Sequence, residues 1–285
     1  MTTTAEQAPA AKADATVPLI EFRDVGKQYG AIIALKGINL RVRAGEVTCV
    51  LGDNGAGKST LIKIMAGLHQ QSDGEVLVDG EPTRLTSPKH ALEKGIATVY
   101  QDLAVVSLMP VWRNFFLGQE VTKKGLSRAL DTAAMRATTK EELHKMGIDL
   151  PNVDATIGSL SGGQRQCVAI ARAVYFGARV LILDEPTAAL GVKQSGLVLR
   201  YVNTAKEHGF GVVFITHNPH HAHMVGDHFV VLNRGHQTLD CAYEDLTLDA
   251  LTQQMAGGDE LEALTRQLRS GATPGEAGST EATVT

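Results

Sequence analysis

The sequence predicts an α/β fold in which a parallel sheet carries a phosphate-binding loop. The first observation is the stretch GDNGAGKS, from Gly52 to Ser59, which lies between a strand pattern, EVTCVL, and a helical pattern, TLIKIMAGL. The second is a pair of apolar runs, RVLILDEP and GFGVVFITH, separated by a helical stretch from Gly191 to His208. A strand, a helix and another strand in this order are typical of a buried parallel sheet.

Composition and charge exclude several classes of protein. The chain has 285 residues, of which 44% are hydrophobic and 20% charged, as in one large globular domain or two small ones. A formal net charge of -4 argues against a dedicated DNA or RNA binder. Cys49, Cys167 and Cys241 form no CxxC, so neither a disulfide framework nor a zinc site is expected, and a reducing cytoplasm suits them. No apolar run approaches the roughly 18 residues of a membrane span, so the sequence predicts a chain that is neither exported nor membrane-spanning.

The first third of the chain is predicted to be β-rich. Residues 1–18 are rich in Ala and Thr without periodicity, which predicts a disordered tail. From Leu19, alternating patterns broken by glycines predict strands in LIEFRDVGKQYG and AIIALKGINLRVRAGEVTCVLG, and two more in GEVLVDG and GIATVYQ.

The middle of the chain predicts an inserted helical subdomain. Between Asp102 and Leu160, MRATTKEELHKMG has helical spacing, whereas the aromatic stretch VWRNFFLGQEV before it is predicted to be a loop. An Ala-rich helix, RQCVAIARAVYF, follows and stops at Gly177. The later pattern DHFVVLNRGHQTLD predicts a β-rich end of the core, and residues 269–285 predict a second tail. No internal repeat is present, so a second copy of the domain must come from another chain.

The phosphate-binding loop has a physical basis in its residue types. The glycines let the loop wrap so that successive backbone N–H groups face inward, and the following helix directs its positive end at the same point. Lys58 can reach the β- and γ-phosphates of a nucleoside triphosphate, and the Ser59 hydroxyl can hold Mg²⁺. The predicted phosphate contacts are Gly52, Asp53, Asn54, Gly55, Ala56, Gly57, Lys58, Ser59 and Thr60.

Two carboxylates complete the predicted chemistry. Asp184 and Glu185 follow the apolar run VLIL, which places them at the carboxyl end of a buried strand beside the phosphate loop. We expect Asp184 to hold magnesium through its water shell and Glu185 to polarise the attacking water. His217, at the end of the run VVFIT, is placed to bond a γ-phosphate or that water.

A second anion-binding motif begins at Leu160 with LSGGQ. Ser161 is predicted to cap the following helix, and the two glycines beside it expose backbone N–H groups at a positive helix end. We do not expect one nucleotide to contact both this site and the phosphate loop of the same chain. The two motifs therefore imply two binding faces on the domain.

Five motifs follow one another along the chain: GDNGAGKS, Gln101 in VYQD, LSGGQ, VLILDEP and ITH. In this order they resemble the nucleotide-binding domain of ABC transporters, and the resemblance covers about residues 19–245. The resemblance implies an ABC-type P-loop NTPase: a mixed sheet core with an N-terminal antiparallel β subdomain and an α-helical subdomain inserted at about 102–177. This domain would span residues 19–256, and residues 257–285 would form a largely disordered C-terminal tail.

The resemblance also implies partners and residue roles. Two chains would form a head-to-tail dimer in which LSGGQ of one closes over the phosphate loop of the other and sandwiches ATP and Mg²⁺. Gln101 would join magnesium to the helical insert, Glu185 would be the catalytic base and His217 the γ-phosphate switch residue. Tyr29 would stack on adenine, with simple packing as the alternative. The catalytic set is Lys58, Glu185 and His217, the magnesium set is Ser59, Gln101 and Asp184, and further nucleotide contacts are Ser161, Gly162, Gly163 and Gln164.

Within that family, NFFLGQE, LSGGQRQ and PTAALGVK are most similar to single-domain ATPases of ribose-, xylose- and fructose-type importers. Such a subunit would sit on the cytoplasmic face of the membrane, bound to separate permease subunits and, through them, to an external sugar-binding protein. Gly191 stands where many relatives have Asp, so a carboxylate that would cross the dimer interface is absent.

Several alternatives stay open at the level of sequence. An efflux or lipid-transport ATPase has the same catalytic motifs, and a soluble ABC ATPase is disfavoured because no sustained heptads occur. The histidines at 217, 220, 221, 223 and 228 could hold a metal, but no fixed ligand spacing recurs, and Pro219 is expected to start a helix after His217. The aromatic run Trp112, Phe115 and Phe116 is either a permease-docking hot spot or the core of the subdomain.

Overall fold

The computed structural model describes residues 17–123 and 129–255. Both predicted tails lie outside these ranges, except for Val17 and Pro18. The tails are predicted over residues 1–18 and 257–285. In the described part of the chain, no helix is long and apolar enough to cross a membrane.

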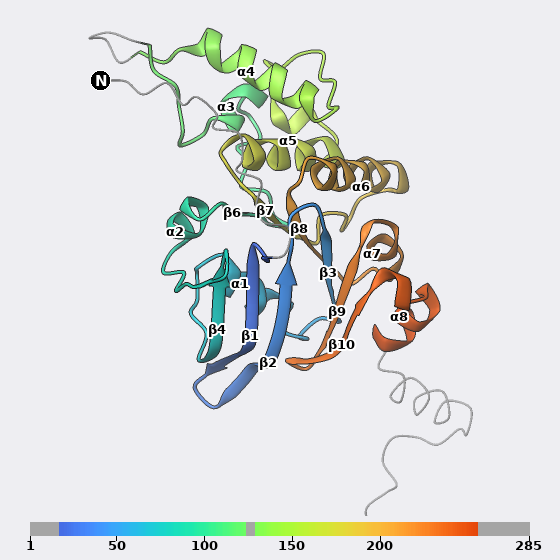
Figure 1. Ribbon diagram of the computed structural model, residues 1–285. Helices are drawn as coiled ribbons and strands as arrows, with labels where there is room; N and C mark the ends of the chain where they lie inside the picture. Colours follow the sequence, from blue (N-terminus) through green and yellow to red (C-terminus); the bar gives the residue numbers. More distant parts are fainter. Residues whose placement is uncertain (1–16, 124–128, 256–285) are drawn as a thin grey trace, which may run out of the picture.

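A single mixed sheet of ten strands, in the order β5-β4-β1-β2-β10-β9-β3-β8-β7-β6, organises the described residues (Figure 1). Neighbouring strands are parallel in the part of the sheet formed by β9, β3, β8, β7 and β6. They are antiparallel in the part formed by β5, β4, β1 and β2. The predicted mixed sheet with an antiparallel N-terminal part is therefore confirmed. The strands are β1 (Ile20–Tyr29), β2 (Ile32–Val42), β3 (Val47–Leu51), β4 (Asp73–Val78), β5 (Glu81–Pro82), β6 (Ile96–Val99), β7 (Val180–Asp184), β8 (Gly211–Thr216), β9 (His228–Asn233) and β10 (His236–Ala242).

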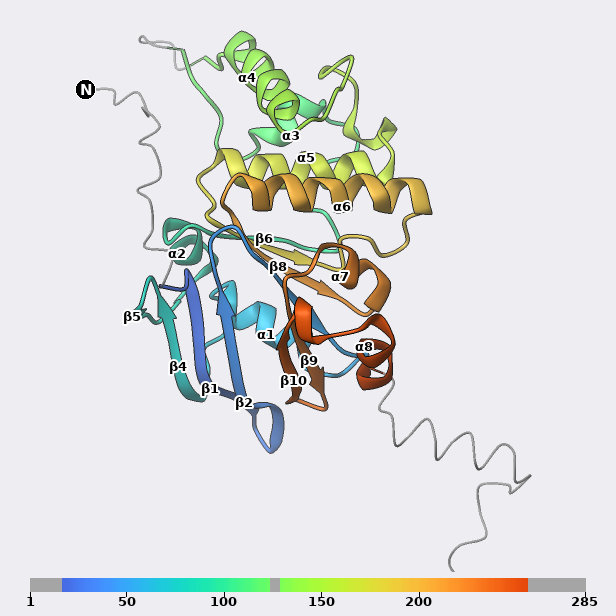
Figure 2. The same cartoon turned by 45° about the vertical axis from the view of Figure 1, so that its right-hand side comes forward.

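Helices lie on both sides of the core sheet (Figure 2). The helix α1 packs between the antiparallel strands and the core, where its Leu61 and Ile62 are buried with residues of β1, β2 and β3. On the opposite side α5 contacts α6, and α3 and α4 lie beyond them. The helices are α1 (Lys58–Met65), α2 (Pro88–Glu93), α3 (Val111–Phe115), α4 (Thr132–Lys145), α5 (Gly162–Tyr175), α6 (Val192–Glu207), α7 (Pro219–Val225) and α8 (Leu248–Met255).

The prediction of a loop over the aromatic stretch after Met109 is wrong, because residues 111–115 form the helix α3. Its Asn114 is buried and uses its carboxamide to bond Val106 N–H and the carbonyls of Val106, Met109 and Pro110. Phe115 and Phe116 pack with Tyr175 and Phe176 of the α5 end. A five-residue helix shows too little periodicity to be recognised, and tertiary burial stabilises it.

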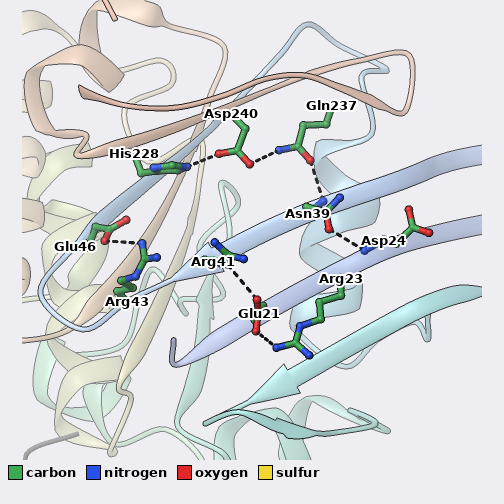
Figure 3. Close-up of polar contacts among 10 residues, drawn as sticks. All are labelled: Glu21, Arg23, Asp24, Asn39, Arg41, Arg43, Glu46, His228, Gln237 and Asp240. Atoms are coloured by element: carbon green, nitrogen blue, oxygen red, sulfur yellow. Dashed lines mark hydrogen bonds and ion pairs between the residues drawn. The ribbon is translucent and has the colours of Figure 1, made fainter. Parts of the chain in front are cut away.

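A narrow seam joins the antiparallel strands to the core sheet. β2 pairs with β10 at one register position, Lys36 with His236. Side chains extend the connection: Asn39 N–H donates to Gln237 Oε1 at 2.8 Å, and Gln237 Nε2 donates to Asp240 Oδ2 at 3.0 Å (Figure 3). Asp240 in turn contacts His228 of β9. Side-chain hydrogen bonds thus supplement sparse backbone pairing where the two parts of the sheet meet.

Candidate functional site

The phosphate loop connects β3 to α1 and requires glycine at specific positions. Gly52, Gly55 and Gly57 have φ angles of 148°, 85° and 109°, which L side chains rarely adopt. A Cβ at Gly52 would come within 2.4 Å of Leu232 O, and one at Gly57 within 2.6 Å of Leu35 Cδ2. Backbone conformation and packing therefore both demand glycine here, and Lys58 begins α1 as predicted.

The Lys58 ammonium lies folded against its own loop. Its Nζ donates to Gly52 O and, at 3.1 Å, to Asp53 O, and the residue is buried. Burial lowers the pKa of Lys58, and the nearby carboxylates of Glu185, Asp53 and Asp184 oppose that shift. The loop from β3 and the end of β7 thus meet at one place, although Asp184 lies 126 positions after Lys58 along the chain.

Asp184 and Glu185 follow β7, which pairs with β6 on one side and β8 on the other. Burial, and then the charge of Glu185, raise the pKa of Asp184, while Lys58 lowers it. Within the described residues, neither the Asp184 carboxylate nor the Ser59 hydroxyl makes a hydrogen bond. A half-buried carboxylate and a hydroxyl without hydrogen bonds are oxygen ligands suited to a hydrated Mg²⁺.

Glu185 is held by groups that follow β8. Its Oε1 lies 2.8 Å from His217 Nδ1, and Thr216 Oγ1 donates to its Oε2 at 3.3 Å. Its backbone has a φ of 47°, in the left-handed region, and its N–H donates to Ile215 O at 2.9 Å. The side chain is only 11% exposed, whereas His217 is 58% exposed and faces outward. Glu185 is therefore oriented by β8 before any substrate arrives.

The LSGGQ segment forms the N-terminus of α5. Ser161 Oγ accepts from Gln164 N–H at 3.3 Å, and Gln164 Oε1 accepts from Ser161 N–H at 2.9 Å, so the predicted cap is confirmed as a capping box. A Cβ at Gly162 would lie 2.6 Å from Leu190 Cδ2, and one at Gly163 3.0 Å from Gln194 O. This segment therefore packs on the start of α6, and among the described residues no hydrogen bond joins it to the phosphate loop.

Tyr29 and Gln101 lie at the periphery of this arrangement. Tyr29, at the end of β1, is 39% exposed; its ring meets His69 edge-on at 5.5 Å, and Lys27 Nζ lies 5.0 Å from its centroid. The exposed Gln101 follows β6, whose neighbour β7 leads to Asp184. The structure leaves both side chains accessible to a ligand.

The histidines of the α7 region have separate partners. His217 contacts Glu185, His221 contacts Thr187, and His228 contacts Asp240. Across residues 17–123 and 129–255, no three His, Cys, Asp or Glu side chains are grouped so that they could hold a metal ion. Pro219 occupies the first turn of α7, as predicted, with Asn218 as its cap.

Sequence reasoning missed Thr187, Thr216 and His221 as parts of this site. Thr216 and Thr187 are buried, and both bond groups across the β7–β8 pair. Thr216 could have been recognised as a site residue because it is the polar residue that ends an apolar strand, directly before His217. Nothing in the linear sequence relates Thr187 to His221, because that contact depends on how the two strands pair.

Comparison with known proteins gives the family of this site. Residues 35–188, which contain the phosphate loop, LSGGQ and both carboxylates, match the family model described as ABC transporter. The chain belongs to the ABC transporter family. As an ABC protein it has the nucleotide-binding fold of that family.

Two ABC relatives match over nearly their whole length. The xylose/arabinose import ATP-binding protein of Sulfolobus acidocaldarius is 42% identical over 237 residues, covering 83% of this chain and 93% of that protein. The fructose import ATP-binding protein of Rhizobium meliloti is 38% identical, covering 85% and 95%. A ribose import ATP-binding protein of Rubrobacter xylanophilus is also 38% identical, but the chain spans about half, 47%, of its length.

Solved structures agree with this assignment. A nucleotide-free ATP-binding cassette from an ABC transporter has a TM-score of 0.73 at 23% identity, covering 82% of this chain and 95% of that one, and shows the fold. A dimeric ATP-binding cassette in a post-hydrolysis state, bound to ADP and inorganic phosphate, has a TM-score of 0.64 at 27% identity, covering 79% and 98%. The predicted ABC-type P-loop fold is confirmed.

Proposed function

We propose that this ABC protein is the ATP-hydrolysing subunit that powers import of a monosaccharide through separate permease subunits. The observation that carries its catalytic part is the convergence of Lys58, Asp184 and Glu185 at the carboxyl ends of β3 and β7. Near-full-length similarity to xylose/arabinose and fructose import ATP-binding proteins supports a sugar as the transported molecule. The subunit acts at the cytoplasmic face of the membrane, where ATP is available.

The phosphate loop holds the triphosphate. Backbone N–H groups of Asp53 to Thr60 and the positive end of α1 surround the β-phosphate, and Lys58 exchanges its carbonyl partners for phosphate oxygens. Ser59, Asp184 and Gln101 hold Mg²⁺, which when bound neutralises charge on the phosphates. Tyr29 stacks on the adenine ring.

Hydrolysis needs a base in line with the γ-phosphate. The Glu185 carboxylate accepts a proton from water while the water oxygen bonds to the γ-phosphorus; the bond from that phosphorus to the β–γ bridging oxygen breaks, giving ADP and inorganic phosphate. His217 bonds the γ-phosphate, and its contact with Glu185 keeps the two groups together. Because Glu185 is already oriented, little reorganisation is needed on binding.

A second chain completes each site. LSGGQ packs against the start of α6, and no hydrogen bond joins it to the phosphate loop among the described residues. The Gly162 and Gly163 N–H groups, with the Ser161 and Gln164 side chains, serve the nucleotide of a head-to-tail partner. The dimeric cassette bound to ADP and phosphate supports this arrangement. A closed dimer holds two ATP molecules between the two kinds of motif.

The permease docks on the apolar groove between α5 and β6, which has a volume of about 280 Å³. Leu103, Ala104 and Val105 line it, and Leu108, three residues further along the chain, is 88% exposed. The hypothesis of an aromatic docking hot spot is wrong, because Trp112, Phe115 and Phe116 are at most 6% exposed and form the core of the helical layer. An external sugar-binding protein delivers the sugar to the permease.

Uptake measurements test this function. In a strain that lacks the gene, we expect accumulation of at least one of radiolabelled xylose, arabinose, ribose or fructose at limiting concentration to fall at least about tenfold. A copy of the wild-type gene restores it, whereas the matched copy carrying Glu185→Gln does not, because the amide cannot accept the water's proton. Normal uptake of all four sugars in the deletion strain would contradict the proposal and favour an efflux ATPase.

A further inference from the structure

A second pair of side chains connects the segment after Glu185 to the segment after His217. Thr187 is buried, and its Oγ1 lies 2.9 Å from Nδ1 of His221 in α7. The first pair is Glu185 with His217, at 2.8 Å. Residues 185–187 and 217–221 therefore face one another through two contacts, and only the first involves groups already assigned to hydrolysis.

The backbone after β7 needs such support. Glu185 and Ala189 both have left-handed φ angles, 47° and 57°. For residues with a Cβ this conformation is strained, and it persists where the surroundings hold it. The backbone bonds in this turn include Glu185 N–H to Ile215 O and Ala188 N–H to Glu185 O. Between the two left-handed residues, Thr187 is the side chain that is anchored.

His221 is itself well fixed. Asn218 Oδ1 accepts from the His221 N–H at 3.2 Å, and Asn218 N–H donates to Thr216 Oγ1 at 3.0 Å. Thr216 is the residue that also bonds Glu185. Burial, and then the neighbouring His220, lower the pKa of His221. Hydrogen bonds thus tie the α7 N-terminus to the end of β8.

We propose that His221 is a positioning residue for hydrolysis: through Thr187 it holds the turn that aims the Glu185 carboxylate at the attacking water. The inference rests on the proposed role of Glu185 as base. His221 acts through its contact with Thr187, so we expect its replacement to change the rate of the chemical step and not nucleotide binding.

Steady-state ATPase measurements with Mg-ATP on the full chain test this role. We expect His221→Ala to lower kcat about 5- to 20-fold while KM and the dissociation constant of a fluorescent ATP analogue stay within about twofold of wild type. Thr187→Val, which removes the hydroxyl and keeps the shape, has the same effect. The double variant is no slower than either single one, because both remove one contact.

Two further variants separate positioning from general loss of structure. His221→Asn places an amide group close to where Nδ1 lies and restores at least half of kcat. His220→Ala is the matched control, since His220 is the exposed neighbour in the same helix turn and its replacement leaves kcat unchanged.

The inference is overturned if His221→Ala keeps kcat within twofold of wild type, if Thr187→Val and His221→Ala lower kcat additively, or if nucleotide affinity falls as much as kcat. Glu185→Gln is measured alongside. Wild-type turnover in Glu185→Gln would refute the proposed base itself, whereas an inactive Glu185→Gln with a fully active His221→Ala refutes only the positioning role.

Discussion

Single residues at the phosphate loop act through geometry and charge together. Gly52 and Gly57 are required both by positive φ and by neighbours closer than 3 Å to a would-be Cβ. Lys58 is buried near three carboxylates, and its ammonium is held at the phosphate loop by hydrogen bonds to loop carbonyls. The site therefore has its cation in place before the nucleotide binds.

Replacing Lys58 with Ala tests this charge. We expect ATP affinity to fall by about 1.5–3 kcal/mol, roughly 10- to 150-fold, because a charge-assisted phosphate contact is lost. Isothermal titration calorimetry with Mg-ATP measures the change. Lys63→Ala, in the last turn of the same helix and exposed, is the control and binds as wild type does. Equal affinity in both variants would refute the assigned role of the phosphate loop.

The motifs predicted Lys58, Asp184, Glu185 and His217 because each has a fixed place relative to a strand end, and the ends of parallel strands meet at one edge. Thr187 and His221 escaped prediction because their contact depends on the pairing of β7 with β8 and on the start of α7. Local sequence carries no information on such a pair.

Among the elements, those with caps or long patterns were predictable and those stabilised only by burial were not. Helix α5 has a Ser161 capping box, and α6 fills the predicted crossover between β7 and β8. Helix α3 has no side-chain cap and exists because Asn114 and the aromatic cluster fix it. Gly191 leaves α6 without a side-chain cap, so the start of this helix lacks the stabilising hydrogen bond that Ser161 gives to α5.

Charge pairing on the antiparallel strands gives an element-scale prediction. Glu21 is buried and accepts from Arg23 at 2.7 Å and from Arg41 at 3.0 Å (Figure 3). These bonds, that from Arg23 most strongly, lower the pKa of Glu21. We expect Glu21→Gln to lower the free energy of unfolding by about 1 kcal/mol at pH 7, a modest loss because water screens the exposed arginines.

The pH dependence of that loss has a definite sign. A carboxyl whose pKa is lower in the folded state stabilises the fold above its unfolded pKa, about 4.3, and this contribution disappears as pH falls through the folded value. Urea unfolding should therefore show the difference between wild type and Glu21→Gln at pH 7 shrinking below about pH 4. The exposed Glu81→Gln serves as the control. A difference independent of pH would mean that packing, not charge, explains the loss.

At the scale of the whole molecule, the two anion-binding motifs face different surroundings. The phosphate loop meets the carboxyl end of β7, whereas LSGGQ packs on the start of α6. This separation is what the proposed head-to-tail pairing of two chains requires, since each nucleotide would then lie between the phosphate loop of one chain and the LSGGQ motif of the other. The sequence predicts this arrangement from two separate motifs in one domain. The apolar groove proposed for the permease could not be predicted, since residues from α2, β6 and α5 line it together.

The mass of the Glu185→Gln protein in solution, measured by light scattering during size-exclusion chromatography, tests the shared site most directly. With saturating Mg-ATP we expect a dimer, because ATP is bound but not hydrolysed, and with ADP a monomer. In this background Ser161→Asn should still dimerise, whereas Ser161→Asp should not: both residues cap α5, but only the carboxylate repels the partner's γ-phosphate. A Glu185→Gln protein that stays monomeric with ATP, or an Asp variant that dimerises as well as the Asn variant, would contradict a nucleotide site completed by a second copy of the chain.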